Sequence, residues 1–232
     1  MSLSTEARHC GTVYVIRCRG GITAGEQSHT LEMAITRGLT EFRRLVIDLG
    51  GVTRLDSSGI GLMVRYLSHT RSRGGDVRLS TAPPFLADLL RVTRLTTVFK
   101  VYDSEEEAIL SFLKEPLARE KDSASSGPGV LFIDRSSDLC AFARAFLGSH
   151  GFNVSSTCRT HDARLLLLGT NFDYVVVGPE SSQTLLPPAD VLKGVAHKAV
   201  VVHLPPNFRH DDPERAGTEL LHLLQRAKGV GA

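Results

Sequence analysis

The segment L-V-I-D-L (45–49) is followed closely by R-L-D-S-S-G-I-G (54–61), and these two stretches decide how the first half of the chain folds. The unbroken apolar run is typical of a buried strand. Beyond it Asp56 is placed to act as a helix N-cap, and apolar residues recur at i, i+3, i+4 and i+7 from Ile60. The sequence therefore predicts a strand that leads into a helix, with the D-S-S-G motif (56–59) at the junction.

Segments typical of strands and of helices alternate along the chain, and a stretch poor in apolar residues divides them into two groups. Residues 116–129 are charged at first and then rich in Ser, Gly and Pro, which is the composition of a linker. The strand-like segments are 13–18, 45–49, 76–80 and 98–102 before the linker, and 130–134, 173–178 and 199–204 after it. We therefore predict two α/β domains, residues 1–115 and 130–232.

Composition and charge exclude several classes of protein. Hydrophobic residues make up 42% of the 232 positions, which is enough for two cores. Residues 1–115 carry 15 Lys and Arg against 13 Asp and Glu, and residues 116–232 carry 12 against 12. Neither half has the basic surplus of a nucleic-acid-binding protein, and no stretch is typical of a signal peptide or a membrane span. We expect a cytoplasmic protein that binds neither nucleic acid nor a membrane.

The cysteines and histidines do not form a recognisable metal or redox motif. No C-x-x-C pair is present, so we expect each cysteine to be a small buried apolar residue in a reducing compartment. The four positions are Cys10, Cys18, Cys140 and Cys158. The histidines that invite a metal hypothesis, together with nearby acids, are His197, His203, His210, Asp211 and Asp212. Their spacing is scattered, and His203 lies in an apolar strand, where we expect a packed core histidine. We therefore predict no metal site and no cofactor.

The D-S-S-G motif allows three interpretations. As a helix start, Asp56 caps the helix, Ser57 and Ser58 fill its first turn, and Gly59 lets the helix pack close to the sheet. A hydrolase nucleophile would need G-x-S-x-G, but Leu55 stands where the first glycine should be if Ser57 were the centre. As a phosphorylation site, a serine at a helix N-terminus would place its phosphate on free N–H groups at the positive end of the helix dipole.

The stretch V-I-D-L-G-G-V-T-R-L-D-S-S-G-I-G-L-M (46–63) resembles the signature of STAS domains of the anti-sigma factor antagonist type, and the resemblance covers roughly residues 10–115. It implies a mixed sheet with helices on one side. It also implies that Ser57 is the phosphorylation site, supported by Asp56, Ser58 and Gly59. The partner implied is an anti-sigma factor that is a serine kinase; phosphorylation breaks the complex and a serine phosphatase restores it. A binding protein of this kind is not an enzyme.

One departure from the family pattern leaves an alternative open. Family members often show G-E-L-D after the second strand, whereas this chain has G-G-I-T, with Thr23 in place of the acid. Because that acid lies beside the phosphorylation site in the family, Thr23 is a candidate partner contact. Its presence favours the alternative function, a STAS scaffold that assembles a signalling complex without a phosphorylation switch.

The second half resembles the CheY-like receiver, a flavodoxin-like parallel α/β fold, in V-L-F-I-D-R (130–135) and D-Y-V-V-V-G-P (173–179). The resemblance places Asp134 and Arg135 at the usual acidic pair, and Gly178 at the usual phosphate acceptor. Glycine cannot be phosphorylated, and one carboxylate makes a poor Mg²⁺ site. Since 28 residues follow Leu204, we expect a truncated, inactive receiver that serves as a homodimer or recruitment surface.

Overall fold

The computed structural model describes residues 2–115, 127–184 and 199–229. The chain separates into two compact units, residues 1–121 and 122–232. Most of the predicted linker, residues 116–126, lies outside the described residues. Each unit has its own sheet and its own apolar core.

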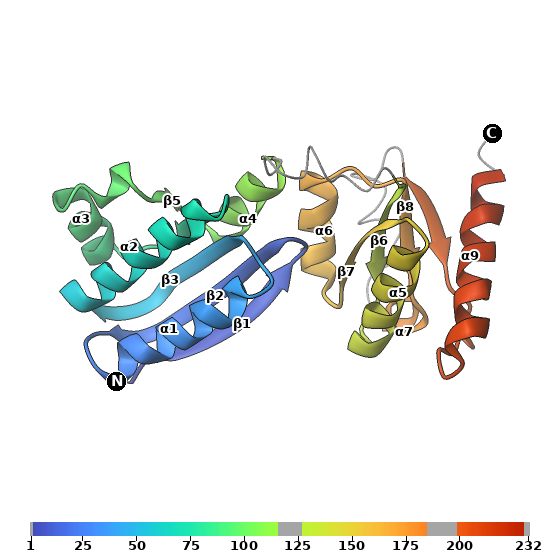
Figure 1. The fold of residues 1–232 in the computed structure, drawn as a ribbon, viewed down its shortest axis with the longest axis horizontal. Helices are drawn as coiled ribbons and strands as arrows, with labels where there is room; N and C mark the ends of the chain where they lie inside the picture. The colour runs from blue at the N-terminus through green and yellow to red at the C-terminus, as the bar shows by residue number, and fades with distance from the viewer. Residues whose placement is uncertain (1, 116–126, 185–198, 230–232) are drawn as a thin grey trace. The chain divides into compact units, whose positions relative to one another are not determined.

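A five-stranded mixed sheet forms the first unit, with its strands in the order β1-β2-β3-β4-β5 (Figure 1). The strands are β1 (Ser4–Cys10), β2 (Val13–Ile22), β3 (Arg44–Leu55), β4 (Asp76–Ser80) and β5 (Lys100–Tyr102). β1 runs antiparallel to β2, and every other pairing is parallel. The mixed sheet that we predicted is therefore present; β1, with its many polar residues, was missed.

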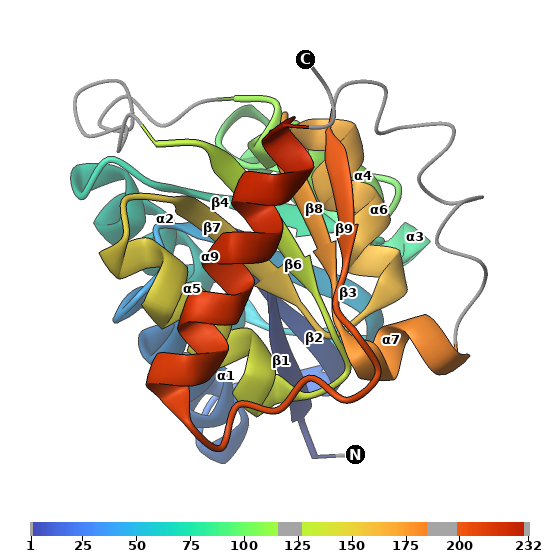
Figure 2. The ribbon, with the colours of Figure 1, turned by 90° about the vertical axis from the view of Figure 1, so that its right-hand side faces the viewer.

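The second unit has a four-stranded, fully parallel sheet in the order β7-β6-β8-β9. Its strands are β6 (Gly129–Ile133), β7 (Asn153–Thr157), β8 (Tyr174–Val177) and β9 (Val200–His203). Its helices are α5 (Ser137–Ser149), α6 (Thr160–Gly169), α7 (Pro179–Thr184) and α9 (Pro213–Gly229), of which α9 lies nearest the viewer in Figure 2. The parallel sheet is as predicted, although β7, which has three hydroxyl side chains, was missed.

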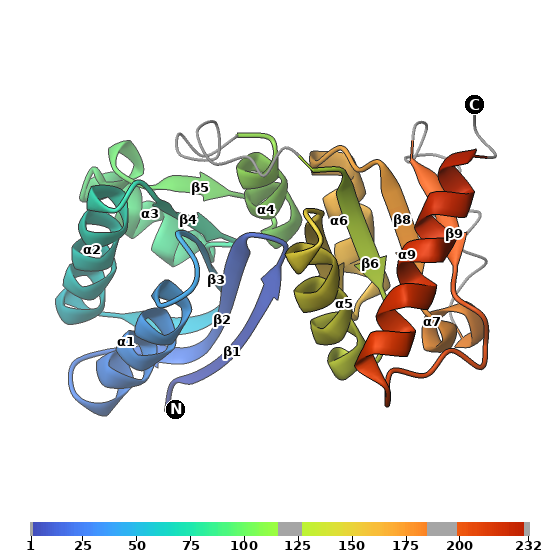
Figure 3. The same ribbon diagram turned by 45° about the vertical axis from the view of Figure 1, so that its right-hand side comes forward.

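Helices cover both faces of this parallel sheet (Figure 3). Val130 and Phe132 of β6 pack with α5 and α9 on one face. Leu131 of the same strand is fully buried on the opposite face, where α6 contacts β6 and β7. Alternate residues of a strand point to opposite faces, so a strand that is covered on both sides needs an unbroken apolar run.

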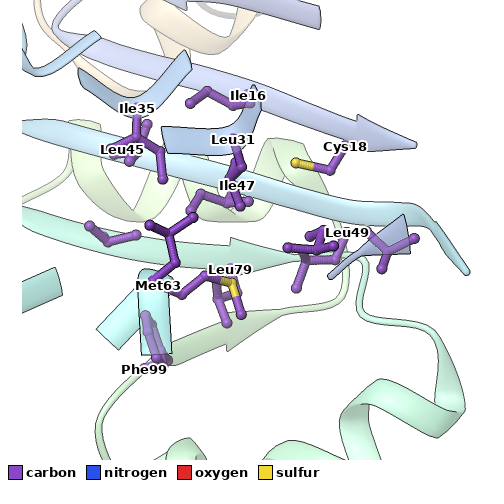
Figure 4. Close-up of a cluster of buried hydrophobic side chains, with 14 of the residues drawn as sticks. Ile16, Cys18, Leu31, Ile35, Leu45, Ile47, Leu49, Met63, Leu79 and Phe99 are labelled. Atoms are coloured by element: carbon purple, nitrogen blue, oxygen red, sulfur yellow. The ribbon is translucent and has the colours of Figure 1, made fainter. Parts of the chain in front are cut away.

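Three helices of the first unit pack on one face of its sheet. They are α1 (Glu26–Leu39), α2 (Ser57–Ser72) and α3 (Pro84–Val92), while a 3-10 turn, η1 (Leu95–Thr97), precedes β5. Figure 4 shows the core between these helices and the sheet, with Leu45 and Ile47 of β3 among side chains such as Leu31 and Met63. Of the apolar positions spaced from Ile60, Met63 and Leu67 are buried in α2, whereas Ile60 and Val64 are only partly buried.

The expectation of helices on one side of the first sheet was wrong. A fourth helix, α4 (Glu105–Leu113), contacts β2, β3, β4 and β5. It packs on the face of the sheet opposite to the main core, against strand residues that alternate with the core residues. The guanidinium carbons of Arg44 and Arg78 on that face lie 5.9 and 3.7 Å from the centroid of the Phe112 ring. Since Val46 is also fully buried, β3 is apolar on both of its faces, and the second face requires a cover of its own.

Candidate functional site at the start of helix α2

Two exposed hydroxyls lie where β3 leads into α2. Ser57 is the first residue of α2 and Ser58 is the second, and the side chains of both are exposed. Among the residues that the structure describes, neither hydroxyl has a hydrogen-bond partner. Both serines are therefore open to an external reagent.

Asp56 caps α2 and also binds a second loop. Its Oδ1 accepts hydrogen bonds from the backbone N–H groups of Ser58 (2.9 Å) and Gly59 (3.0 Å), while Oδ2 accepts one from Ala24 (2.9 Å). The bond from Ala24, followed by that from Gly59, lowers the pKa of the Asp56 carboxyl. The predicted N-cap is confirmed, and the contact to Ala24 was not predicted because no local pattern links residues 32 positions apart.

Gly59 allows α2 to approach the sheet closely. A Cβ at this position would lie 2.7 Å from the carbonyl oxygen of Ile22 and 2.6 Å from a methyl group of Leu55. The main-chain N–H of Asp56 also donates to the Ile22 oxygen, at 3.3 Å. The end of β2 and the start of α2 are thus in backbone contact, which leaves no room for a side chain at Gly59.

Thr23 lies in the β2–α1 loop that Asp56 holds. It is half-buried, its Oγ1 lies 3.3 Å from Oε1 of Gln27, and its carbonyl oxygen accepts a hydrogen bond from the N–H of Ser28 at 3.0 Å. The neighbouring Ala24 donates to Asp56, so this loop lies beside the D-S-S-G motif. A protein that covers Ser57 would meet the loop of Thr23 as well.

The phosphate environment that we predicted for the first turn of α2 needs correction. We expected free N–H groups there, but those of Ser58 and Gly59 already donate to the carboxylate of Asp56. A phosphate on Ser57 would therefore compete with a neighbouring carboxylate for the same donors. The helix dipole favours an anion at this end, while the charge of Asp56 opposes a second one.

In the second unit, Asp134 occupies the space of the side chain that Gly178 lacks. The carboxylate of Asp134 is fully buried; it accepts hydrogen bonds from the N–H groups of Ser136 (2.8 Å), Glu180 (3.0 Å) and Ser181 (3.3 Å). A Cβ at Gly178 would lie 2.2 Å from Asp134 Oδ2. The carboxylate of Asp134 is therefore occupied by hydrogen bonds from main-chain N–H groups. The neighbouring Arg135 is exposed.

Two expectations about histidine and cysteine were wrong. His203, expected in the core, is the last residue of β9 and is exposed. Cys158, also expected to be buried, is exposed, whereas Cys10, Cys18 and Cys140 are buried as predicted. His197 lies outside the described residues. Within the described part of the chain, no group of three or more His, Cys, Asp or Glu side chains could hold a metal ion.

In the part of the chain that the structure describes, no helix is both long and apolar enough to cross a bilayer. Both units instead bury their apolar residues between helices and sheets.

Comparison with known proteins supports a STAS domain in the N-terminal half. A family model described as "STAS domain" matches residues 4–108. The anti-sigma F factor antagonist of Paenibacillus polymyxa is 26% identical over 112 residues, which cover 47% of this chain and 94% of that protein. The solved structure of an anti-sigma factor antagonist from Mycobacterium paratuberculosis is 24% identical, covers 47% of this chain and 93% of its own, and has a TM-score of 0.41. The Bacillus cell fate determinant SpoIIAA in its phosphorylated form is 18% identical, covers 47% and 99%, and has a TM-score of 0.39.

Proposed function

We propose that the first unit is an anti-sigma factor antagonist that binds an anti-sigma serine kinase and is released from it by phosphorylation of Ser57. The STAS match and the name of the Paenibacillus relative support the class of protein. The observation that carries the proposal is the exposed hydroxyl of Ser57 at the first position of α2, without a hydrogen-bond partner in the described part of the chain. A serine phosphatase restores the binding form, and the protein itself is not an enzyme.

The surroundings of Ser57 explain why its modification would change binding more than folding. A phosphate adds about −1.5 to −2 charges at neutral pH. Asp56 lies beside it, and its negatively charged carboxylate already accepts hydrogen bonds from Ala24, Ser58 and Gly59. The added charge therefore stays on the surface without neutralisation by the cap. A partner surface that fits the unmodified serine would then meet at least two negative charges where it had met one.

The test is phosphorylation with the purified anti-sigma kinase and ATP, with the site mapped by mass spectrometry. Wild type and Ser58→Ala should be labelled and Ser57→Ala should not. Ser58→Ala is a matched control because both hydroxyls are exposed in the same helical turn. Labelling of Ser57→Ala at the wild-type rate would exclude Ser57 as the acceptor.

The alternative is a STAS scaffold that assembles a signalling complex without a switch. The observation that favours it is Thr23, which replaces an acid of the family pattern in the loop bound to Asp56. A scaffold would bind the kinase equally well before and after treatment with ATP. Measuring the affinity for the kinase before and after the phosphorylation reaction therefore separates the two functions.

For the second unit we propose an inactive receiver-like domain that binds a second copy of the chain or another protein. Gly178 lacks an acceptor group, and Asp134 is engaged by three backbone N–H groups. Acetyl phosphate with Mg²⁺ should therefore leave the NMR spectrum of this unit unchanged. A phosphorylated residue in the unit would contradict the proposal.

A further inference from the structure

Two thiols of the second unit are in contact although they come from different elements. Cys140 lies in the first turns of α5, and Cys158 follows β7 directly. Their Sγ atoms are 3.8 Å apart. Cys140 is 4% exposed, whereas Cys158 is exposed to solvent. One thiol is thus accessible, and the other lies immediately behind it.

We propose that Cys140 and Cys158 form a redox-active dithiol that small-molecule disulfides oxidise to an intramolecular disulfide. In the first step the thiolate of Cys158 attacks one sulfur of R–S–S–R and forms a mixed disulfide, Cys158–S–S–R. The original S–S bond breaks and RS⁻ leaves. In the second step Cys140 loses its proton to solvent, and its thiolate attacks Cys158 Sγ and expels the second RS⁻. The protein loses two electrons and two protons, and the small disulfide becomes two thiols.

The environments of the two thiols set this order of attack. Burial, together with the neighbouring Cys158 thiol, raises the pKa of Cys140 to about 12. The thiol of Cys140 also donates to the carbonyl oxygen of Asp134, at 3.3 Å. A buried, protonated thiol is a poor first nucleophile, because the thiolate is the reactive form. Cys158 is therefore the point of entry, and Cys140 becomes the resolving thiol once a mixed disulfide lies against it.

The bond requires only a local movement. The two sulfurs must approach from 3.8 Å to about 2.0 Å, the length of a disulfide bond. Cys158 lies between β7 and α6, outside both elements, so its side chain can shift without breaking the strand or the helix. The disulfide would join the start of α5 to the end of β7, two elements that already contact each other.

The remaining cysteines serve as internal controls. Cys10 and Cys18 are fully buried in the first unit, and burial raises the pKa of Cys18 to about 12. They should remain reduced under conditions that oxidise the pair. Any reaction of these two thiols would report unfolding rather than exchange at the proposed site.

The experiment uses the full chain in mixtures of oxidised and reduced glutathione, followed by acid quenching, alkylation and peptide mapping. Wild type should yield a linked Cys140–Cys158 peptide, two hydrogens lighter than the reduced pair, and excess reduced glutathione should reverse it. Cys140→Ser should stop at a glutathione adduct on Cys158. Cys158→Ser should form neither product over the same time, and Cys140→Ala provides a second variant without a resolving thiol.

Two results would overturn the proposal. One is a glutathione adduct that persists on Cys158 of the wild type without formation of the linked peptide. The other is oxidation that yields only chains joined to each other through Cys158. The wild-type result is decisive by itself, so poor folding of a variant does not remove the test.

Discussion

At the residue scale, the D-S-S-G motif combines a structural role with the regulatory role that we propose, in four consecutive positions. The carboxylate of Asp56 accepts hydrogen bonds from main-chain N–H groups and Gly59 lies against the end of β2, whereas Ser57 and Ser58 are exposed. The division predicts that substitutions at the inner positions change stability and that substitutions at the outer positions change binding.

Ser57→Asp should fold as the wild type does but bind the anti-sigma partner at least tenfold more weakly. A carboxylate at a helix N-terminus contributes about 0.3–1 kcal/mol of stability, and the neighbouring Asp56 opposes part of that gain. Thermal unfolding should therefore change little, while titration calorimetry reports the loss of affinity. Ser57→Asn controls for side-chain size without charge. Equal affinities of Ser57→Asp and wild type would support the scaffold.

Gly59→Ala and Gly61→Ala form a matched pair within α2. A Cβ at Gly59 would lie 2.7 Å from the Ile22 carbonyl oxygen, whereas nothing lies within 4 Å of a Cβ at Gly61. We expect Gly59→Ala to lower the free energy of unfolding by about 1–3 kcal/mol. Gly61→Ala should raise it by about 0.5–1 kcal/mol, because alanine loses less backbone entropy in a helix. Urea denaturation measures both, and equal effects would show that α2 does not pack as described.

At the scale of elements, an ion cluster joins α4 to β1 and β2. Glu105, the first residue of α4, pairs with Arg8 of β1 and with Arg17 of β2, where the Arg17 Nε to Glu105 Oε2 distance is 2.6 Å. Only 8% of the Glu105 side chain is exposed. Burial raises the pKa of this carboxyl, but the two guanidinium groups lower it by more, so its pKa lies below the ordinary value.

Glu105→Gln should destabilise the first unit by about 3 kcal/mol at neutral pH, because the variant leaves buried guanidinium charge without a carboxylate. Glu107→Gln, in the exposed part of the same turn, should have little effect. Denaturant unfolding of the full chain, followed through the transition of the first unit, measures both. A Glu105→Gln protein as stable as Glu107→Gln would contradict the role of the cluster.

The pH dependence of stability follows from the lowered pKa of Glu105. The contribution of an acid with a lowered folded pKa is fully present above its unfolded pKa, about 4.3 for glutamate. It is lost as the pH falls through the folded pKa, where the carboxylate is protonated and its pairs with Arg8 and Arg17 are broken. The difference in unfolding free energy between wild type and Glu105→Gln should therefore be constant above pH 5 and shrink below pH 4. A difference that grows in acid would exclude this cause.

Another matched pair of glycines tests the second unit. Gly178→Ala places a Cβ 2.2 Å from Asp134 Oδ2, while nothing lies within 4 Å of a Cβ at Gly148 in α5. Gly178→Ala should cost about 1–3 kcal/mol, because the buried Asp134 and its backbone partners must move. Gly148→Ala should be neutral or stabilising. Thermal unfolding of the full chain distinguishes the two variants. If Gly178→Ala were as stable as the wild type, the Asp134 carboxylate could not lie against Gly178 as described.

At the scale of the whole molecule, β9 forms one edge of the parallel sheet in the described residues. It pairs there with β8, and Val201 on it is 37% exposed. A sheet edge can pair with another strand. The proposed dimer thus belongs to the second unit, whereas the proposed switch belongs to the first.

We therefore expect light scattering to give a dimer mass for the full chain and a monomer mass for residues 1–121. The fragment ends at Lys121, the last residue of the first unit, so that it retains Glu115. The side chain of Glu115 pairs with Arg78, and its carbonyl oxygen accepts a hydrogen bond from Arg44. Val201→Lys on the full chain keeps both units and adds a charge to the edge, so it should also give a monomer. A monomeric wild type at high concentration would exclude the homodimer and leave recruitment of another protein.

Local chemistry made much of this protein predictable from its sequence. The run 45–49 and the spacing from Ile60 predicted β3 and α2, because burial requires apolar residues at the period of the element. Asp56 was predicted as a cap because a short acceptor before a helix satisfies its first N–H groups. These features depend on neighbours within a few residues, so a linear sequence contains them.

Contacts between distant residues were decided only by the tertiary structure. The hydrogen bond from Ala24 to Asp56, the Glu105 cluster, the cover that α4 gives to the second face of the sheet and the contact of Cys140 with Cys158 all join separate elements. The strands β1 and β7 were missed for the same reason, since polar side chains make them depend on pairing with a neighbour. Each of these features requires a pairing that forms only when the chain folds, and no local pattern specifies which partner it meets.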